Sequence, residues 1–278
     1  MMESTIGMIH SIPGSLVLTV YLAMTVLMTM LWAVQRRIRN ASIGDVGWCV
    51  GLICAVLWYA TQANGSPERI FLTVLLVTVY AGRLGLYILF NRVLGKQEDA
   101  RYRQLREEWG EAAAAKMLAY FLVQALALVA FSLPFLVLLW TPRSSFMLAE
   151  CIGLLIWGVA VVGEALADRQ LANFRADPRN LGHVCRQGLW AYSRHPNYFF
   201  EWLHWCAYVV MTLGMPGWVL TWIGPIGMGV ALITITGIPR AEAQALSNRG
   251  EEYTIYQATT SAFFPWFPRP RPNKPTSL

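Results

Sequence analysis

Charged side chains are scarce in this chain: they make up 14% of its 278 residues, whereas hydrophobic side chains make up 56%. An average soluble domain carries about 25% charged residues, so this composition excludes an ordinary soluble fold and indicates an integral membrane protein. The net charge of +6 is therefore no sign of a nucleic-acid partner. We expect it to set the orientation of the chain and to meet anionic lipid headgroups.

Common catalytic and metal-binding motifs are also missing. There is no Walker A sequence, no HExxH and no GxSxG, and no GxGxxG follows a predicted strand. The five cysteines include no CxxC pair, so we interpret them as small buried residues rather than as a disulfide, metal or redox set. The start of the sequence lacks the basic residues of a signal peptide, so we expect no cleavage there. The sequence thus predicts no metal site and implies no protein partner.

Long apolar runs dominate what is present. Runs of about twenty residues suit a membrane span, so we predict an all-α, polytopic membrane protein with seven transmembrane helices in one domain, residues 1–278. The Pro-rich end, residues 265–278, is predicted to be irregular. The predicted spans are about 14–34, 44–61, 70–90, 117–140, 147–167, 199–214 and 217–238.

Basic residues collect in alternate loops of this seven-span arrangement. Nineteen of the 22 Lys and Arg residues follow the first, third, fifth or seventh span, and the opposite loops hold only Arg69 and Arg143. The positive-inside rule then predicts that the N-terminus lies outside and the C-terminus in the cytoplasm.

Polar side chains share one face of the third predicted span and one face of the sixth. Those of the third are Tyr80, Arg83, Tyr87 and Asn91, and those of the sixth are Asn197, Glu201, His204 and Tyr208. Lipid offers no hydrogen-bond partners, so we expect the two faces to turn toward each other and to line a cavity open to the cytoplasm. The alternative is that they only join helices, with Glu201 pairing with Arg83 or His204.

Carboxylates at the span ends allow two interpretations each. Asp45 opens the second span, either as part of a site or as an N-terminal helix residue favoured by the helix dipole. Glu164 and Asp168 precede four arginines and His183, which suits an anion-binding mouth or a solvated basic loop. Because guanidinium groups bind phosphate well, the residues predict an anionic cytoplasmic ligand beside an apolar substrate, and no particular reaction.

Three stretches together resemble the bacterial branch of the steroid 5-alpha-reductase family: "RLGLYILFNRVLGKQEDARYRQLREEWG", "QGLWAYSRHPNYFFEWLHW" and "RGEEYTIYQATTSAFFPWFP". The likeness runs from the second predicted span to the tail. The RHPNY element alone also resembles sterol reductases and isoprenylcysteine carboxyl methyltransferases. The resemblance implies a seven-helix oxidoreductase, in a bacterial inner membrane with its mouth on the cytoplasmic side. It would use NADPH to reduce the carbon–carbon double bond of a 3-oxo-delta-4 steroid or a related enone lipid.

The resemblance also implies site residues by position. Tyr80 matches the tyrosine that hydrogen-bonds the ketone, and Asp45 falls where the family has a catalytic glutamate. The implied NADPH site comprises Arg83, Tyr87, Asn91, Arg92, Asp168, Arg175, His183, Arg194, His195, Asn197, Tyr198, Glu201 and Glu242. Phe200 stands where a glycine is usual, and the region of Arg240 and Glu242 replaces a histidine-containing stretch of animal members.

The implied mechanism needs a donor at the carbonyl oxygen, where hydride transfer to an enone places negative charge. We expect Tyr80 to be that donor with Asp45 as its partner, and a protonated Asp45 would donate a second hydrogen bond. A methyltransferase that uses S-adenosylmethionine is the alternative enzyme, because it shares the RHPNY element. A lipid-binding or scaffold protein without catalysis is the third possibility, which would not explain the polar faces.

Overall fold

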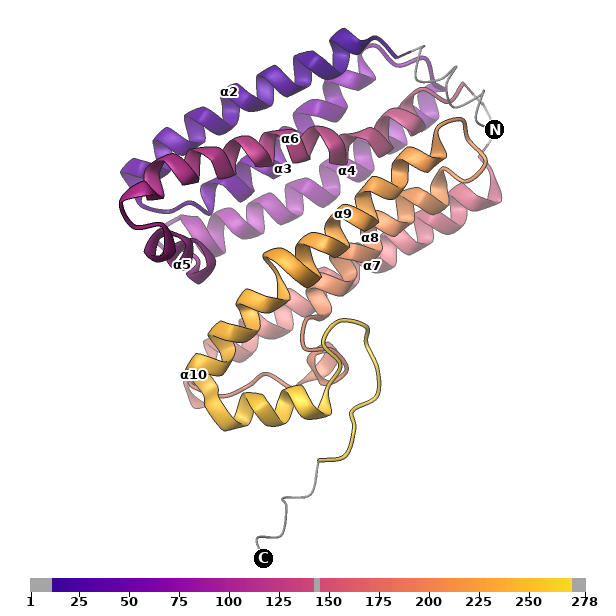
Figure 1. Cartoon of the computed structure of the whole chain (residues 1–278). Helices are drawn as coiled ribbons and strands as arrows, with labels where there is room; N and C mark the ends of the chain where they lie inside the picture. Colours follow the sequence, from indigo (N-terminus) through magenta and orange to yellow (C-terminus); the bar gives the residue numbers. More distant parts are fainter. Residues whose placement is uncertain (1–11, 143–145, 272–278) are drawn as a thin grey trace, which may run out of the picture. The chain divides into compact units, whose positions relative to one another are not determined.

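The computed structural model describes residues 12–142 and 146–271, and it is helical throughout (Figure 1), with 79% helix and no named strand among the described residues. The all-α prediction is confirmed. The chain divides into two compact units. Unit 1 comprises residues 1–151 and 208–224, and unit 2 comprises residues 152–207 and 225–278.

Unit 1 is built from four long helices. The helices are α2 (Gly14–Ile38), α3 (Ile43–Ala60), α4 (Pro67–Ile88) and α6 (Ala113–Leu139). Helix α3 packs against the other three, and α2 also packs against α6. A Cβ added to Gly85 of α4 would lie 3.0 Å from the Cβ of Cys49 of α3, so a small residue lets these two helices approach closely.

The π-helical turn Leu89–Val93 continues α4, and the short helix α5 (Ala100–Trp109) follows it. Helix α5 packs against α6. The sequence analysis did not predict α5, because the stretch is polar and short and carries no apolar run. It brings a set of charged side chains against the ends of α2 and α3.

Unit 2 contains most of α7 (Leu148–Ala176), most of α8 (Pro196–Met211), α9 (Ile223–Val230) and α10 (Ile238–Thr259). Figure 1 shows α7, α8 and α9 side by side, and the Trp202 indole of α8 donates to the Pro225 carbonyl of α9 at 3.1 Å. A second π-helical turn, Ala231–Ile235, separates α9 from α10. Helix α10 is kinked at Gly250, where φ is +48°. Residues 265–271 form no helix, and residues 272–278 of the predicted irregular tail lie outside the described residues.

Six helices in the described residues are long and apolar enough to cross a membrane, which supports a multi-pass integral membrane protein. The expected sixth span, 199–214, corresponds to α8, whose 16 residues are not among the six. The six are Gly14–Ile38, Ile43–Ala60, Pro67–Val93, Ala100–Leu139, Leu148–Ala176 and Trp218–Thr259.

Candidate functional site

The turn before α8, residues 193–195, is held by several polar contacts within unit 2. Arg194 donates from Nε to Glu242 at 2.7 Å and from Nη1 to the backbone carbonyl of Gln257 at 3.0 Å. Only 10% of the Arg194 side chain and 14% of the Glu242 side chain are exposed. The sequence analysis assigned both residues to a cofactor site, and the structure brings them together as an ion pair.

The backbone of the tail also holds this turn. Ser193 and Ser261 form an isolated parallel bridge, and the Arg194 amide donates to the Ser261 carbonyl at 2.8 Å. The Ser193 hydroxyl donates to the Phe263 carbonyl at 2.9 Å. Residues that are almost 70 positions apart therefore fix the conformation of the turn.

His195 is buried beside the same carboxylate, with its Nε2 at 3.2 Å from Glu242. Its ring stacks on Tyr198, with the two planes 7° apart and the centroids 5.2 Å apart. Burial lowers the pKa of His195 more than the neighbouring Glu242 raises it. A neutral imidazole that donates from Nε2 to the carboxylate is the form expected at pH 7.

Asn197 lies in the first turn of α8 and donates from Nδ2 to the buried carboxylate of Asp168 at 3.3 Å. Its Oδ1 atom is buried and has no hydrogen-bond partner among the described residues. One turn further on, Glu201 accepts a hydrogen bond from the Trp205 indole at 3.0 Å. The helix N-terminus, the oriented amide and its unused acceptor together suit a ligand with an amide N–H and anionic groups.

The polar residues of α4 belong to unit 1. Tyr80 is buried, at 1% exposure, whereas Arg83 and Tyr87 are half-buried. Asn91 is exposed and donates to the Tyr87 carbonyl at 2.9 Å. Arg92 pairs with Asp99 at 3.2 Å. These residues thus run from a buried position to the polar end of α4.

Asp45 is held by side chains of α5 and α6. It accepts a hydrogen bond from Arg101 at 2.6 Å and another from the Tyr102 hydroxyl at 2.6 Å, both from α5 (Ala100–Trp109). The Gln124 amide approaches the same carboxylate at 3.4 Å. The expectation that Tyr80 and Asp45 act together on a ketone stays a prediction, and α5 supplies Asp45 with a cation and a phenol that the sequence did not place near it. The spacing of Asp99 two residues before Arg101, typical of a helix N-cap, was the signal that could have revealed α5.

Two other predicted residues of unit 2 are exposed, one at the end of α7 and one in the loop that follows it. Arg175 is exposed near the end of α7, and His183 is exposed with its Nδ1 at 3.2 Å from Glu252. These side chains are at the surface, unlike His195 and Asp168.

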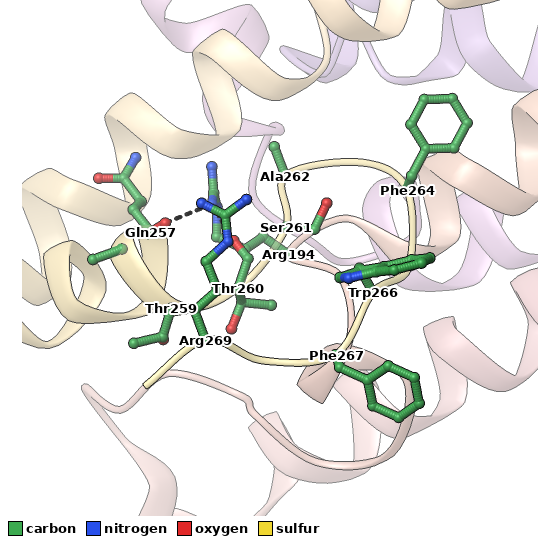
Figure 2. A pocket seen from close by; sticks show the side chains of 11 residues that line it. Arg194, Gln257, Thr259, Thr260, Ser261, Ala262, Phe264, Trp266, Phe267 and Arg269 are labelled. Atoms are coloured by element: carbon green, nitrogen blue, oxygen red, sulfur yellow. Dashed lines mark hydrogen bonds between the residues drawn. The ribbon is translucent and has the colours of Figure 1, made fainter. Parts of the chain in front are cut away.

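Two cavities open on unit 2. The first, of about 420 Å³, is lined by Arg194, Gln257, Ala258, Thr259, Thr260, Ser261, Ala262, Phe264, Trp266, Phe267 and Arg269 (Figure 2). The second, of about 630 Å³, is lined by Gln170, Asn173, Phe174, Asp177, Arg179, Asn180, Gln187 and Gly188. Both are lined by polar residues together with at least one aromatic ring.

Comparison with known proteins gives a family without an assigned activity. A family model described as "Protein of unknown function (DUF1295)" matches residues 31–260. An uncharacterized protein of Schizosaccharomyces pombe is 24% identical over 274 residues, covering 86% of this chain and 77% of the relative. No solved structure matches the chain.

Proposed function

The chain belongs to the DUF1295 family, which contains steroid 5-alpha-reductase-like membrane proteins, and from this premise we propose that it is an NADPH-dependent membrane reductase. Its substrate would be a 3-oxo-delta-4 steroid or another enone lipid, whose carbon–carbon double bond it reduces. The proposal includes seven spans and a site that takes the nucleotide from the cytoplasm.

One observation carries the proposal: the buried Oδ1 of Asn197 has no partner in the described structure, while its Nδ2 is held by Asp168. Because a buried polar atom without a partner costs about 1–3 kcal/mol, such an atom calls for a ligand. The carboxamide of nicotinamide has two N–H donors, and the fixed acceptor of Asn197 fits one of them. The residues present therefore fit this group.

The chain's residues would act as follows. NADPH, when bound, would supply the hydride that reduces the beta carbon of the enone, and water or the Tyr80 hydroxyl would supply the proton that the alpha carbon takes up. Tyr80 would donate a hydrogen bond to the carbonyl oxygen and stabilise the charge that develops there. Asp45 is salt-bridged to Arg101, and an ionised carboxylate accepts hydrogen bonds but cannot donate one to a ketone. The salt bridge therefore favours Tyr80 as the carbonyl donor over a protonated Asp45.

Phosphate binding is assigned to exposed and half-buried arginines rather than to Arg194. Arg175, exposed at the end of α7, keeps its guanidinium at the surface. Arg194 is already committed to Glu242 and to backbone carbonyls, so we assign it to holding the turn that precedes Asn197.

The test uses the full chain purified in detergent. We expect NADPH, and not S-adenosylmethionine, to raise its melting temperature in a concentration-dependent manner. Asn197→Ala should weaken NADPH binding about tenfold, the effect of losing roughly 1.4 kcal/mol of hydrogen bonding. Asn248→Ala, at an exposed position of α10, is the matched control and should bind normally.

Turnover is then measured as NADPH oxidation with a 3-oxo-delta-4 steroid, and the product is identified by a mass gain of two hydrogens. A melting shift with S-adenosylmethionine alone would replace the proposal with a methyltransferase. Binding of neither molecule would favour a protein without catalysis.

A further inference from the structure

The segment that follows α10, residues 260–271, is here called the C-terminal loop. It carries large aromatic side chains that unit 2 does not cover: Phe264 is 57% exposed, Trp266 70% and Phe267 74%. A soluble surface rarely presents so much aromatic area together. A partner surface is therefore needed to cover it.

The exposure is imposed by the backbone. The Trp266 amide donates to the Tyr192 carbonyl at 2.9 Å, and the Arg269 amide donates to the Thr259 carbonyl at 2.7 Å. The loop is also joined to the turn before α8 through the bridge between Ser193 and Ser261. These bonds hold the aromatic side chains outward, because the loop cannot turn them inward without breaking several of them.

The aromatic side chains continue a group on α8. Phe263 and Phe264 pack edge-on against Trp202, with centroids 5.9 and 5.7 Å apart. Phe267 packs edge-on against Tyr192 at 6.0 Å. Aromatic side chains gathered around the start of an apolar helix are typical of the membrane–water interface, where one part of each ring meets lipid.

The 420 Å³ cavity gives this surface a cationic pocket. Figure 2 shows Gln257 of α10 and Arg269 on one side of the pocket, and Phe264, Trp266 and Phe267 on the other. Arg194 is neutralised by Glu242. Arg269 is exposed, and within the described residues its guanidinium has no hydrogen-bond or ion-pair partner. The lining includes no acidic side chain, so its net charge favours an anion.

We infer that the C-terminal loop binds the phosphate headgroup of an anionic phospholipid, with Arg269 contacting the phosphate and Trp266 and Phe267 resting in the interface beside it. The six membrane-spanning candidates place the chain in a bilayer, so lipid is the partner at hand. A nucleotide phosphate would pair with Arg269 equally well, but it would leave the exposed rings of Trp266 and Phe267, here called the aromatic rim, uncovered. A lipid accounts for both the cationic Arg269 and the exposed aromatic side chains. The proposed cofactor site does not depend on this inference.

The test titrates the full chain in detergent with phosphatidylglycerol, with phosphatidylcholine of the same acyl chains, and with glycerol 3-phosphate. We expect phosphatidylglycerol to raise the melting temperature at lower concentration than phosphatidylcholine, and free glycerol 3-phosphate to have no effect. Arg269→Gln should weaken the response to phosphatidylglycerol about fivefold, since a basic side chain at an anionic surface contributes about 1 kcal/mol. Arg103→Gln, an exposed arginine of α5, is the matched control and should respond like the wild-type chain.

Replacing both Trp266 and Phe267 with alanine should weaken the responses to both lipids, because the rim contacts glycerol and acyl groups. Both residues are exposed, so the variant is expected to fold. An unchanged response of Arg269→Gln to phosphatidylglycerol would refute the inference. Equal potency of free glycerol 3-phosphate would also refute the inference, and so would loss of the lipid response when NADPH is added. Either result would mean that the pocket binds the phosphate of a soluble molecule. Failure of NADPH to bind would leave the lipid result intact.

Discussion

The most exacting test of the fold concerns the buried ion pair of Arg69 and Glu150 in unit 1. Arg69 lies in the first turns of α4 and is 1% exposed, and Glu150 lies in the first turn of α7 and is 5% exposed. The pair is bidentate: Nε donates to Oε1 at 2.8 Å and Nη2 donates to Oε2 at 3.2 Å. Arg69 also donates to the Thr141 carbonyl at 3.2 Å, and Glu150 accepts from the Met147 amide at 2.9 Å.

Glu150→Ala leaves the Arg69 guanidinium buried without its carboxylate partner. Removal of one partner of a buried pair costs about 3–5 kcal/mol. For domains of about 150–250 residues that corresponds to a loss of roughly 6–20 °C in Tm. The assay is thermal unfolding of the detergent-purified chain, followed by circular dichroism and by the fluorescence of its tryptophans.

A matched variant separates burial from charge. Glu68→Ala removes an exposed carboxylate in the same turn of α4, which costs only the interaction with the helix dipole, about 0.3–1 kcal/mol. The double variant Arg69→Met with Glu150→Leu removes both charges and should recover much of the loss, because well-packed apolar residues replace a buried pair at little cost. If Glu150→Ala lowers Tm no more than Glu68→Ala does, the pair contributes no more than a surface bridge and the reasoning fails.

Two further predictions concern the proposed donor Tyr80, in unit 1, and the turn at Gly188, in unit 2. Tyr80→Phe should lower kcat for an enone at least a hundredfold with little change in NADPH affinity, since removing one preformed donor to a developing oxyanion costs about 2.7–4 kcal/mol. Tyr59→Phe is the control: it removes a buried hydroxyl bonded to Ser132 at 2.9 Å and should lower stability but not kcat. Equal losses of kcat in the two variants would refute the assignment of Tyr80. Gly188→Ala should destabilise the chain by about 1–3 kcal/mol, because φ is +57° there and the new Cβ would lie 2.3 Å from the Gln170 amide that holds this turn. Gly182→Ala, at φ +84° with open space around it, tests the backbone strain alone, and the two variants should differ in a melting assay.

The apolar runs predicted most of the fold because every helix that crosses the lipid needs about twenty consecutive apolar residues. Among the described residues, the first five predicted spans each correspond to a helix, and the structure extends several of them by a few residues. The elements that were missed, α5 and the polar part of α10, lie outside this rule. Their stability comes from partners far away in the sequence, such as Asp45 for Arg101 and Glu242 for Arg194. Such pairing carries no local periodicity, so hydropathy cannot reveal it.

The candidate site was predictable in composition but not in pairing. Sequence reasoning named Asn197, Asp168, Arg194, His195 and Glu242, and the structure joins them into two small clusters of unit 2. Tyr80 with its neighbours on α4 lies in unit 1. The contacts of Asp45 with Arg101 and Tyr102 could not be predicted, because both residues belong to α5, a helix that the sequence did not reveal.

The buried ion pair of Arg69 and Glu150 affects the count of basic residues from which the orientation was predicted. Arg69 was counted among the few basic residues on the side expected to face outward, as if it were a solvated loop residue. In the structure it is buried, and Glu150 compensates its charge. The positive-inside rule counts Lys and Arg residues in loops, and Arg69 lies inside α4 rather than in a loop. Without Arg69 the predicted asymmetry between the two sides is larger, and the cytoplasmic C-terminus stays a prediction. Fusion of a reporter active only in the cytoplasm to the C-terminus tests this directly, and an inactive fusion would reverse the orientation.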